Sequence, residues 1–129
     1  MAKEHGISDK GHIYGTEYGS VHQHEDIKFV KYNFSSNAKA PLETMTKGRI
    51  YATLDAKNNV KYITFYDRNN MKFKQIDVSG KPHYIDEKKV LPHVHVGYIH
   101  DEHDTRTLNR QEQKTVDRVL KIWNAINDR

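Results

Sequence analysis

One stretch decides the fold: Val60-Lys61-Tyr62-Ile63-Thr64-Phe65-Tyr66-Asp67-Arg68-Asn69-Asn70-Met71-Lys72-Phe73-Lys74-Gln75-Ile76-Asp77-Val78. Its β-branched and aromatic residues predict two strands, 60–66 and 71–78. The triplet Arg68-Asn69-Asn70 predicts a tight turn between them, because Asn tolerates left-handed backbone angles. A second turn of the same kind, Lys57-Asn58-Asn59, joins this pair to a strand over 48–55. The three strands therefore form an antiparallel meander.

The remaining elements extend from this meander in both directions. Upstream, residues 27–34 read as a strand, and the polar segment 1–26 is interpreted as a flexible N-terminal arm. Downstream, the alternation in 93–100 predicts another strand. The chain closes with an amphipathic helix over 109–128, whose Asn109 and Glu112 have the spacing of a capping box.

These elements predict a single α+β domain over 1–129. Its antiparallel sheet of about five strands lies in 27–104, and the long C-terminal helix packs on one face. The helix carries apolar residues at helical spacing, which should face the sheet: Val116, Val119, Leu120, Trp123 and Ile126. Trp123 should be largely buried.

Composition excludes several classes of function. The 129 residues include no cysteine, which excludes disulfides, zinc–thiolate sites and cysteine nucleophiles. No apolar run is long enough to span a membrane, and residues 1–10 lack the apolar core of a signal peptide, so a cytoplasmic protein is expected. Lys and Arg total 21 against 17 acidic residues, a net charge of +4, and there are nine histidines. Protonation of these histidines would strengthen attraction to polyanions such as nucleic acid.

The most informative chemical feature is the placement of histidines. His93 and His95 are two residues apart in a predicted strand, so both imidazoles lie on one face while Val94 and Val96 lie on the other. The valine face is expected to be core, which directs the two histidines toward solvent or a cleft. His83 precedes the pair, and Arg106 follows it.

Three interpretations of this cluster compete. In the first, the histidines act as acid and base in metal-independent RNA cleavage, with a cation from Arg106, Lys74 or Arg68 stabilising the phosphorane. In the second, the pair chelates a metal with a third ligand from elsewhere. The candidates for that third ligand are His83, His100, His103 and Asp101. In the third, the histidines are simply polar residues on an exposed strand.

Several short motifs resemble a known family. They are Gly80-Lys81-Pro82-His83, Leu91-Pro92-His93-Val94-His95-Val96-Gly97-Tyr98 and the helix segment Val119-Leu120-Lys121-Ile122-Trp123-Asn124. Together they are similar to a domain near the minor head proteins of tailed phages, in the phage-borne branch of the barnase–EndoU–colicin–RelE superfamily of ribonuclease folds. The segment from Lys10 to Tyr18 resembles the His-x-x-Gly-Thr turn of related phage and toxin domains.

The resemblance implies a metal-independent ribonuclease-like domain, associated with a phage or a toxin. The alternative is a non-catalytic phage module that binds nucleic acid or another virion protein. The predicted catalytic residues are His93, His95, His83 and Arg106. The predicted substrate contacts are Lys74, Lys81, Tyr98, His12 and Thr16. No metal and no cofactor are expected, and the expected partners are RNA or another nucleic acid and a phage head protein.

Overall fold

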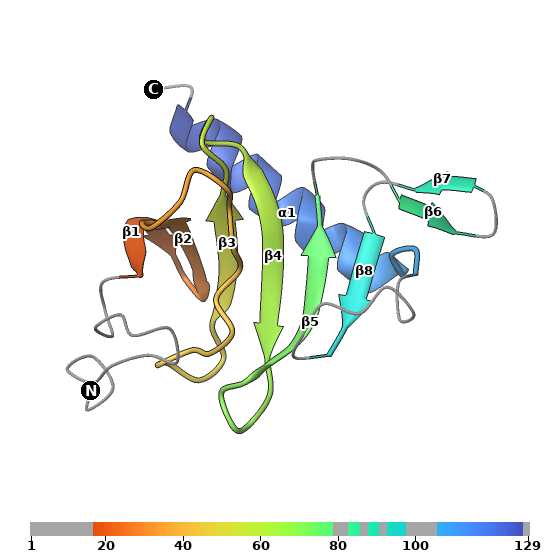
Figure 1. The fold of residues 1–129 in the computed structure, drawn as a ribbon, viewed down its shortest axis with the longest axis horizontal. Helices are drawn as coiled ribbons and strands as arrows, with labels where there is room; N and C mark the ends of the chain where they lie inside the picture. Colours follow the sequence, from red (N-terminus) through yellow and green to blue (C-terminus); the bar gives the residue numbers. More distant parts are fainter. Residues whose placement is uncertain (1–16, 79–82, 86–87, 91–92, 98–105, 128–129) are drawn as a thin grey trace.

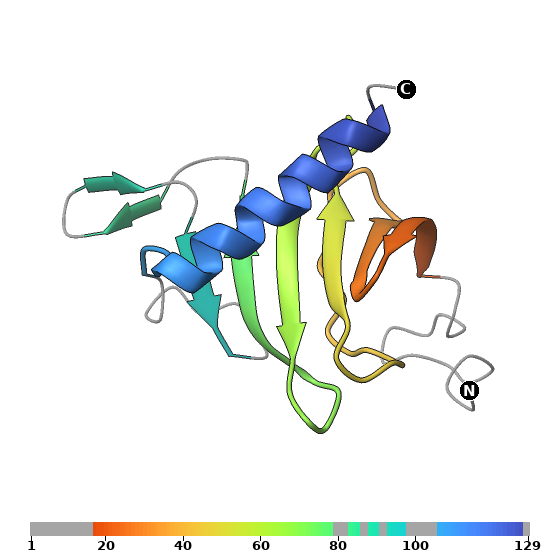
Figure 2. The ribbon, with the colours of Figure 1, turned by 180° about the vertical axis from the view of Figure 1, so that it is seen from behind.

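The computed structural model describes residues 17–78, 83–85, 88–90, 93–97 and 106–127, with the backbone alone for 83–85 and 88–90. The fold class is α+β, as predicted. A six-stranded sheet is crossed on one face by a C-terminal helix (Figures 1 and 2). The strands of the sheet, in spatial order, are β1 (Tyr18–His24), β2 (Ile27–Tyr32), β3 (Ile50–Leu54), β4 (Val60–Tyr66), β5 (Lys72–Asp77) and β8 (His93–Val96). A separate two-stranded sheet pairs β6 (His83–Ile85) with β7 (Lys88–Val90).

The sheet differs from the prediction in strand number and in direction. Tyr18–His24, assigned above to the N-terminal arm, form the edge strand β1, so the main sheet has six strands rather than about five. The pair β2 and β3 is parallel, whereas every other pair in this sheet is antiparallel. A parallel pair needs a crossover connection, and the segment 33–49 carries the chain back to supply it.

The two Asn-rich turns have the backbone predicted for them. Asn58 and Asn70 each have a φ of 65°, in the left-handed region. An aspartate opens each turn: the Asp55 carboxylate accepts hydrogen bonds from the amides of residues 57 and 59, and the Asp67 carboxylate from those of 69 and 71. These local bonds fix the register of β3, β4 and β5.

Helix α1 (Arg110–Asn127) begins with the predicted capping box. The Glu112 amide donates to the Asn109 side chain at 2.8 Å, and the Asn109 amide donates to the Glu112 carboxylate at 2.9 Å. These two bonds satisfy amide donors that a helix start leaves unpaired. No helix in the described part of the chain is long and apolar enough to cross a membrane.

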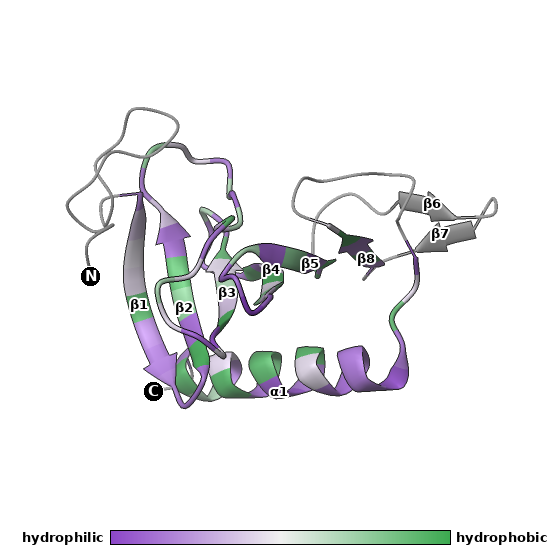
Figure 3. Ribbon diagram, turned by 90° about the horizontal axis from the view of Figure 1, so that it is seen from below, coloured by the Kyte–Doolittle hydropathy of each residue, from purple (hydrophilic) through white to green (hydrophobic). Residues whose placement is uncertain are grey.

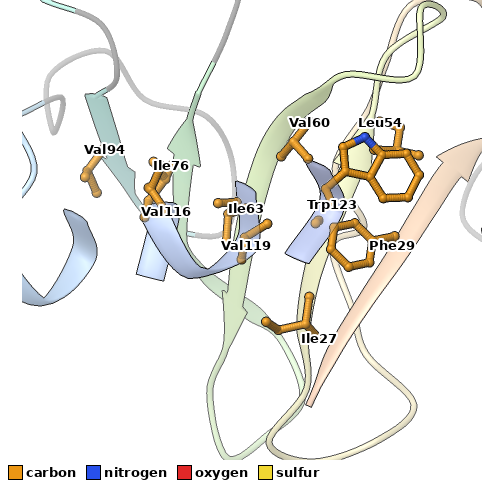
Figure 4. Close-up of a cluster of buried hydrophobic side chains, with 11 residues drawn as sticks. Ile27, Phe29, Leu54, Val60, Ile63, Ile76, Val94, Val116, Val119 and Trp123 are labelled. Atoms are coloured by element: carbon orange, nitrogen blue, oxygen red, sulfur yellow. The ribbon is translucent and has the colours of Figure 1, made fainter. Parts of the chain in front are cut away.

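The hydrophobic core lies between α1 and the sheet (Figure 3). Trp123 is 5% exposed and stacks on Phe29, with ring centroids 5.0 Å apart. Figure 4 shows this pair at one end of the core and Val94 of β8 at the other. The core includes Ile27, Phe29, Ala52, Leu54, Val60, Ile63, Ile76, Val94, Val116, Val119 and Trp123.

The opposite face of the sheet is polar but also largely buried. The segment between β2 and β3 runs over this face, away from the helix (Figures 1 and 3). The Tyr66 hydroxyl donates to the Pro41 carbonyl of this segment at 2.6 Å, and Thr44 bonds to the Tyr51 hydroxyl at 3.2 Å. The fold therefore has three layers, and hydrogen bonds tie this covering segment to Tyr51 and Tyr66 of the sheet.

Candidate functional site

Two strands bring Asp77, His93 and His95 together on the polar face. In the pairing of β5 with β8, Asp77 lies opposite His93 and Gln75 lies opposite His95. Ile76 and Val94 alternate with these residues and belong to the core, so the polar side chains lie on the face away from α1. The backbone register, rather than any loop, therefore sets the position of all three side chains.

The two imidazoles converge on one carboxylate oxygen. Nε2 of His93 is 3.2 Å from Oδ2 of Asp77, and Nε2 of His95 is 3.3 Å from the same atom. The two rings meet edge to face, with centroids 4.7 Å apart. One nitrogen from each ring and one carboxylate oxygen all lie within 4.8 Å of one another.

The cluster is enclosed. His93 is 1% exposed and His95 is 2% exposed, so the expectation that this pair faces solvent or an open cleft is wrong. Alternation along a strand assigns residues to two faces but does not reveal whether the second face is also covered. Burying three such groups costs free energy unless they satisfy one another or a bound ion.

Hydrogen bonds hold the Asp77 carboxylate in its charged form. Burial alone would raise the pKa of Asp77, but hydrogen bonds from His95 and Gln75, and the attraction of either imidazole in its protonated form, lower it below its ordinary value. Behind Asp77, Gln75 donates to Oδ1 at 2.8 Å and accepts from the Lys72 ammonium at 2.8 Å. Oδ2 of Asp77 and the Nε2 atoms of His93 and His95 could therefore contact the same bound group.

The spacing of these atoms suits a divalent metal ion. Zinc binds imidazole nitrogens and carboxylate oxygens at about 2.0–2.2 Å, and tetrahedral ligands at such distances lie about 3.3–3.6 Å apart. The two separations in the structure, 3.2 and 3.3 Å, lie at the short end of that range. Two histidines and one carboxylate are a ligand set of catalytic zinc sites and of non-haem iron sites.

The three candidate cations lie elsewhere: Arg68 is exposed in the turn between β4 and β5, and the other two lie near the start of α1. The backbone of Arg106 pairs with Val94 at the outer edge of β8, and its guanidinium donates two hydrogen bonds to the Glu112 carboxylate, each 2.7 Å long. Lys74 joins the same carboxylate at 3.0 Å. Arg106 and Lys74 therefore meet Glu112 on the helix side of the sheet, on the face opposite His93 and His95.

Several predicted residues are not placed by the structure. His12, Thr16, Lys81 and Tyr98 lie outside the described residues, as do His100, Asp101 and His103, which were considered as metal ligands. The backbone of His83 lies in β6, opposite Val90.

Sequence reasoning missed Asp77, the carboxylate that joins the histidine pair. The signal was present, because Gln75 and Asp77 share one face of the predicted strand 71–78 just as His93 and His95 share one face of theirs. What was missing was the pairing of these two strands, which are separated by 15 residues in the chain (78–92).

No family model, no curated protein and no solved structure matches this chain.

Proposed function

We propose that this protein binds a divalent transition-metal ion, with zinc as the reference ion, through Asp77, His93 and His95. The observation that carries the proposal is the convergence of both Nε2 atoms on Oδ2 of Asp77, at 3.2 and 3.3 Å, in an enclosed site. It replaces the expectation, drawn from the sequence, that the protein holds no metal. That expectation rested on the absence of cysteine thiolates and on the lack of fixed spacing among the histidines beyond this one pair.

The chemistry of the donors favours zinc or ferrous iron over magnesium or calcium. Imidazole nitrogens suit the first two ions, whereas magnesium and calcium prefer a shell of oxygen ligands. These three side chains would fill three of the four positions of a tetrahedral shell, and three-ligand zinc sites in enzymes leave the fourth position to water or substrate. At such a site the metal would polarise a bound carbonyl or phosphoryl oxygen, or lower the pKa of bound water.

The proposal is tested by zinc titration of protein that carries no histidine tag and has been stripped with a chelator. We expect one zinc per chain by elemental analysis and by calorimetry. Asp77→Asn keeps the shape of the side chain but removes its charge. Loss of a residue that only hydrogen-bonds to a metal ligand costs about 10–100-fold in metal affinity. Loss of the charged ligand itself should cost at least as much, so we expect zinc binding to weaken by about 100-fold. At the same zinc concentration, the Tm of the wild type should also rise by more than that of Asp77→Asn.

The matched control is His24→Ala. His24 lies in β1, and its side chain is 47% exposed, so removing it should leave the zinc affinity unchanged. Equal affinities for the wild type and Asp77→Asn, or zinc bound only at several weak sites, would refute the proposal.

RNA cleavage without metal is the second candidate function. It is favoured by the edge-to-face imidazole pair, 4.7 Å between centroids, which shares one orienting carboxylate and could supply both an acid and a base. The resemblance of the Pro92-His93-Val94-His95 segment to phage ribonuclease-like domains supports the same function. In this proposal the cation that stabilises the phosphorane would not be Arg106 or Lys74.

This second candidate is tested by incubating the protein with total RNA in EDTA from pH 5 to 8. The expected result is cleavage that persists in EDTA, gives 2′,3′-cyclic phosphate ends and falls by about 100-fold in His95→Ala. Intact RNA at every pH would exclude cleavage, whereas cleavage that stops in EDTA and returns with zinc would assign it to the metal.

A further inference from the structure

A chain of buried polar side chains continues from the Asp77 carboxylate along β5. The Lys72 ammonium donates to Oε1 of Gln75 at 2.8 Å, and Nε2 of Gln75 donates to Oδ1 of Asp77 at 2.8 Å. Lys72, Gln75 and Asp77 are 5%, 6% and 8% exposed. A buried ammonium is costly, and burial lowers the pKa of Lys72 even though Asp77 attracts its charge. The Lys72 ammonium is therefore not an ordinary surface charge, and its burial needs a structural or functional reason.

The donors and acceptors of Lys72, Gln75 and Asp77 allow only one arrangement of hydrogen bonds among them. An ammonium donates but does not accept, and a carboxylate accepts but does not donate. The Gln75 amide must therefore turn its oxygen to Lys72 and its nitrogen to Asp77. This fixes the Asp77 carboxylate with Oδ1 on Gln75 and Oδ2 toward both histidines.

A β-bulge brings Lys72 to this face. In the pairing of β4 with β5, Phe65 lies opposite Lys74 but Tyr66 lies opposite Lys72, so Phe73 is the extra residue. Without the bulge, alternation would place Lys72 on the helix side with Lys74 and Ile76. Bulges are common beside functional sites because they re-aim a side chain in this way.

We propose that Gln75, held by Lys72, positions Asp77 as a ligand that binds the metal through Oδ2 alone. This inference rests on the metal site proposed above and adds two positioning residues to it. Outer partners of this kind orient metal ligands and tune the affinity of the site, and their loss costs 10–100-fold in metal affinity. A network that only stabilised the fold would change the Tm of the metal-free protein and leave the zinc affinity alone.

The test measures zinc affinity and metal-free Tm for Gln75→Leu and Lys72→Met. We expect zinc affinity to fall by about 10–100-fold in both variants with one zinc still bound per chain. Lys72→Arg, which keeps a charged donor, should recover most of the loss. Cobalt substituted for zinc should give a visible spectrum that differs between Gln75→Leu and the wild type, because a released carboxylate changes the coordination of the ion.

The matched control is Thr64→Val. Thr64 is fully buried, lies opposite Gln75 on β4 and bonds to the Tyr66 hydroxyl at 2.8 Å, outside the chain to Asp77. Its variant should lose stability while keeping the zinc affinity of the wild type.

The outcomes separate the two proposals. A wild type that binds no zinc refutes the metal site itself. A wild type that binds zinc, with Gln75→Leu and Lys72→Met within twofold of its affinity, keeps the metal site and refutes the positioning role. If Gln75→Leu does not fold, the comparison of Lys72→Met with Lys72→Arg decides the matter in the same way.

Discussion

Replacing Trp123 with alanine is expected to lower the free energy of unfolding by about 3–5 kcal/mol, the cost of removing a large aromatic side chain from a core. The Trp123 ring stacks on Phe29 of β2, with centroids 5.0 Å apart, and its indole N–H donates to the Asn58 carbonyl at 2.8 Å. One side chain thus joins α1 to a strand and to the turn between β3 and β4. Urea unfolding followed by circular dichroism measures the loss.

Two further variants give this result its meaning. Trp123→Phe keeps an aromatic ring against Phe29 but loses the bond to Asn58, so it should cost clearly less than alanine, with about 1 kcal/mol of its loss due to that bond. Asn124→Ala, at the next and exposed position of the helix, should stay within about 0.5 kcal/mol of the wild type. A loss below about 1 kcal/mol for Trp123→Ala would mean that the helix does not depend on this contact.

The parts of the fold that the sequence predicts correctly are those with local causes. The capping box of Asn109 and Glu112 spans three residues, and both Asn turns are closed by an aspartate four residues or fewer away. Such signals act through hydrogen bonds between near neighbours in the chain. They can therefore be read before anything is known of the tertiary structure.

The features that were missed depend on contacts between distant segments. Strand alternation indicated that His93 and His95 share a face, but whether that face is buried depends on how distant parts of the chain pack. The parallel pairing of β2 with β3 likewise follows from the route of the segment 33–49 and has no local signature. Arg106 was grouped with the histidines because it is close to them in sequence. In the structure its backbone pairs with Val94 of β8, and its guanidinium bonds to Glu112 of the helix instead.

Glu112 is the second residue whose replacement we expect to lower the free energy of unfolding by a large amount. Its carboxylate is 2% exposed and accepts two bonds of 2.7 Å from Arg106, a third from the Asn109 amide at 2.9 Å, and an ion pair with Lys74 at 3.0 Å. The Arg106 bonds lower its pKa most; burial opposes them, and the Asn109 amide and Lys74 add to them. The result is a pKa of about 2, against an ordinary value of 4.5.

Glu112→Gln is therefore expected to lower the free energy of unfolding by about 2–3 kcal/mol at neutral pH. The difference between the folded and ordinary pKa corresponds to roughly 3 kcal/mol, and water screening of the partly exposed Arg106 reduces it somewhat. Because the folded pKa is the lower one, the contribution is fully present above pH 4.5. It declines as the pH falls below that value and is gone near pH 2.

Urea unfolding of the wild type and of Glu112→Gln from pH 7 down to pH 2 tests this dependence. The stability difference between the two proteins should shrink over the lower half of that range, since protonated glutamic acid and glutamine are then both neutral. Glu25→Gln is the control, because Glu25 also pairs with an arginine, Arg118 at 2.8 Å, but these side chains are 68% and 41% exposed. An exposed pair contributes less than about 1 kcal/mol, so this variant should resemble the wild type. Two results would contradict this role of the buried carboxylate: a loss of unfolding free energy in Glu112→Gln no larger than in Glu25→Gln, or a loss that does not change with pH. In either case, the Glu112 carboxylate would not stabilise the contact of the start of α1 with β5 and Arg106.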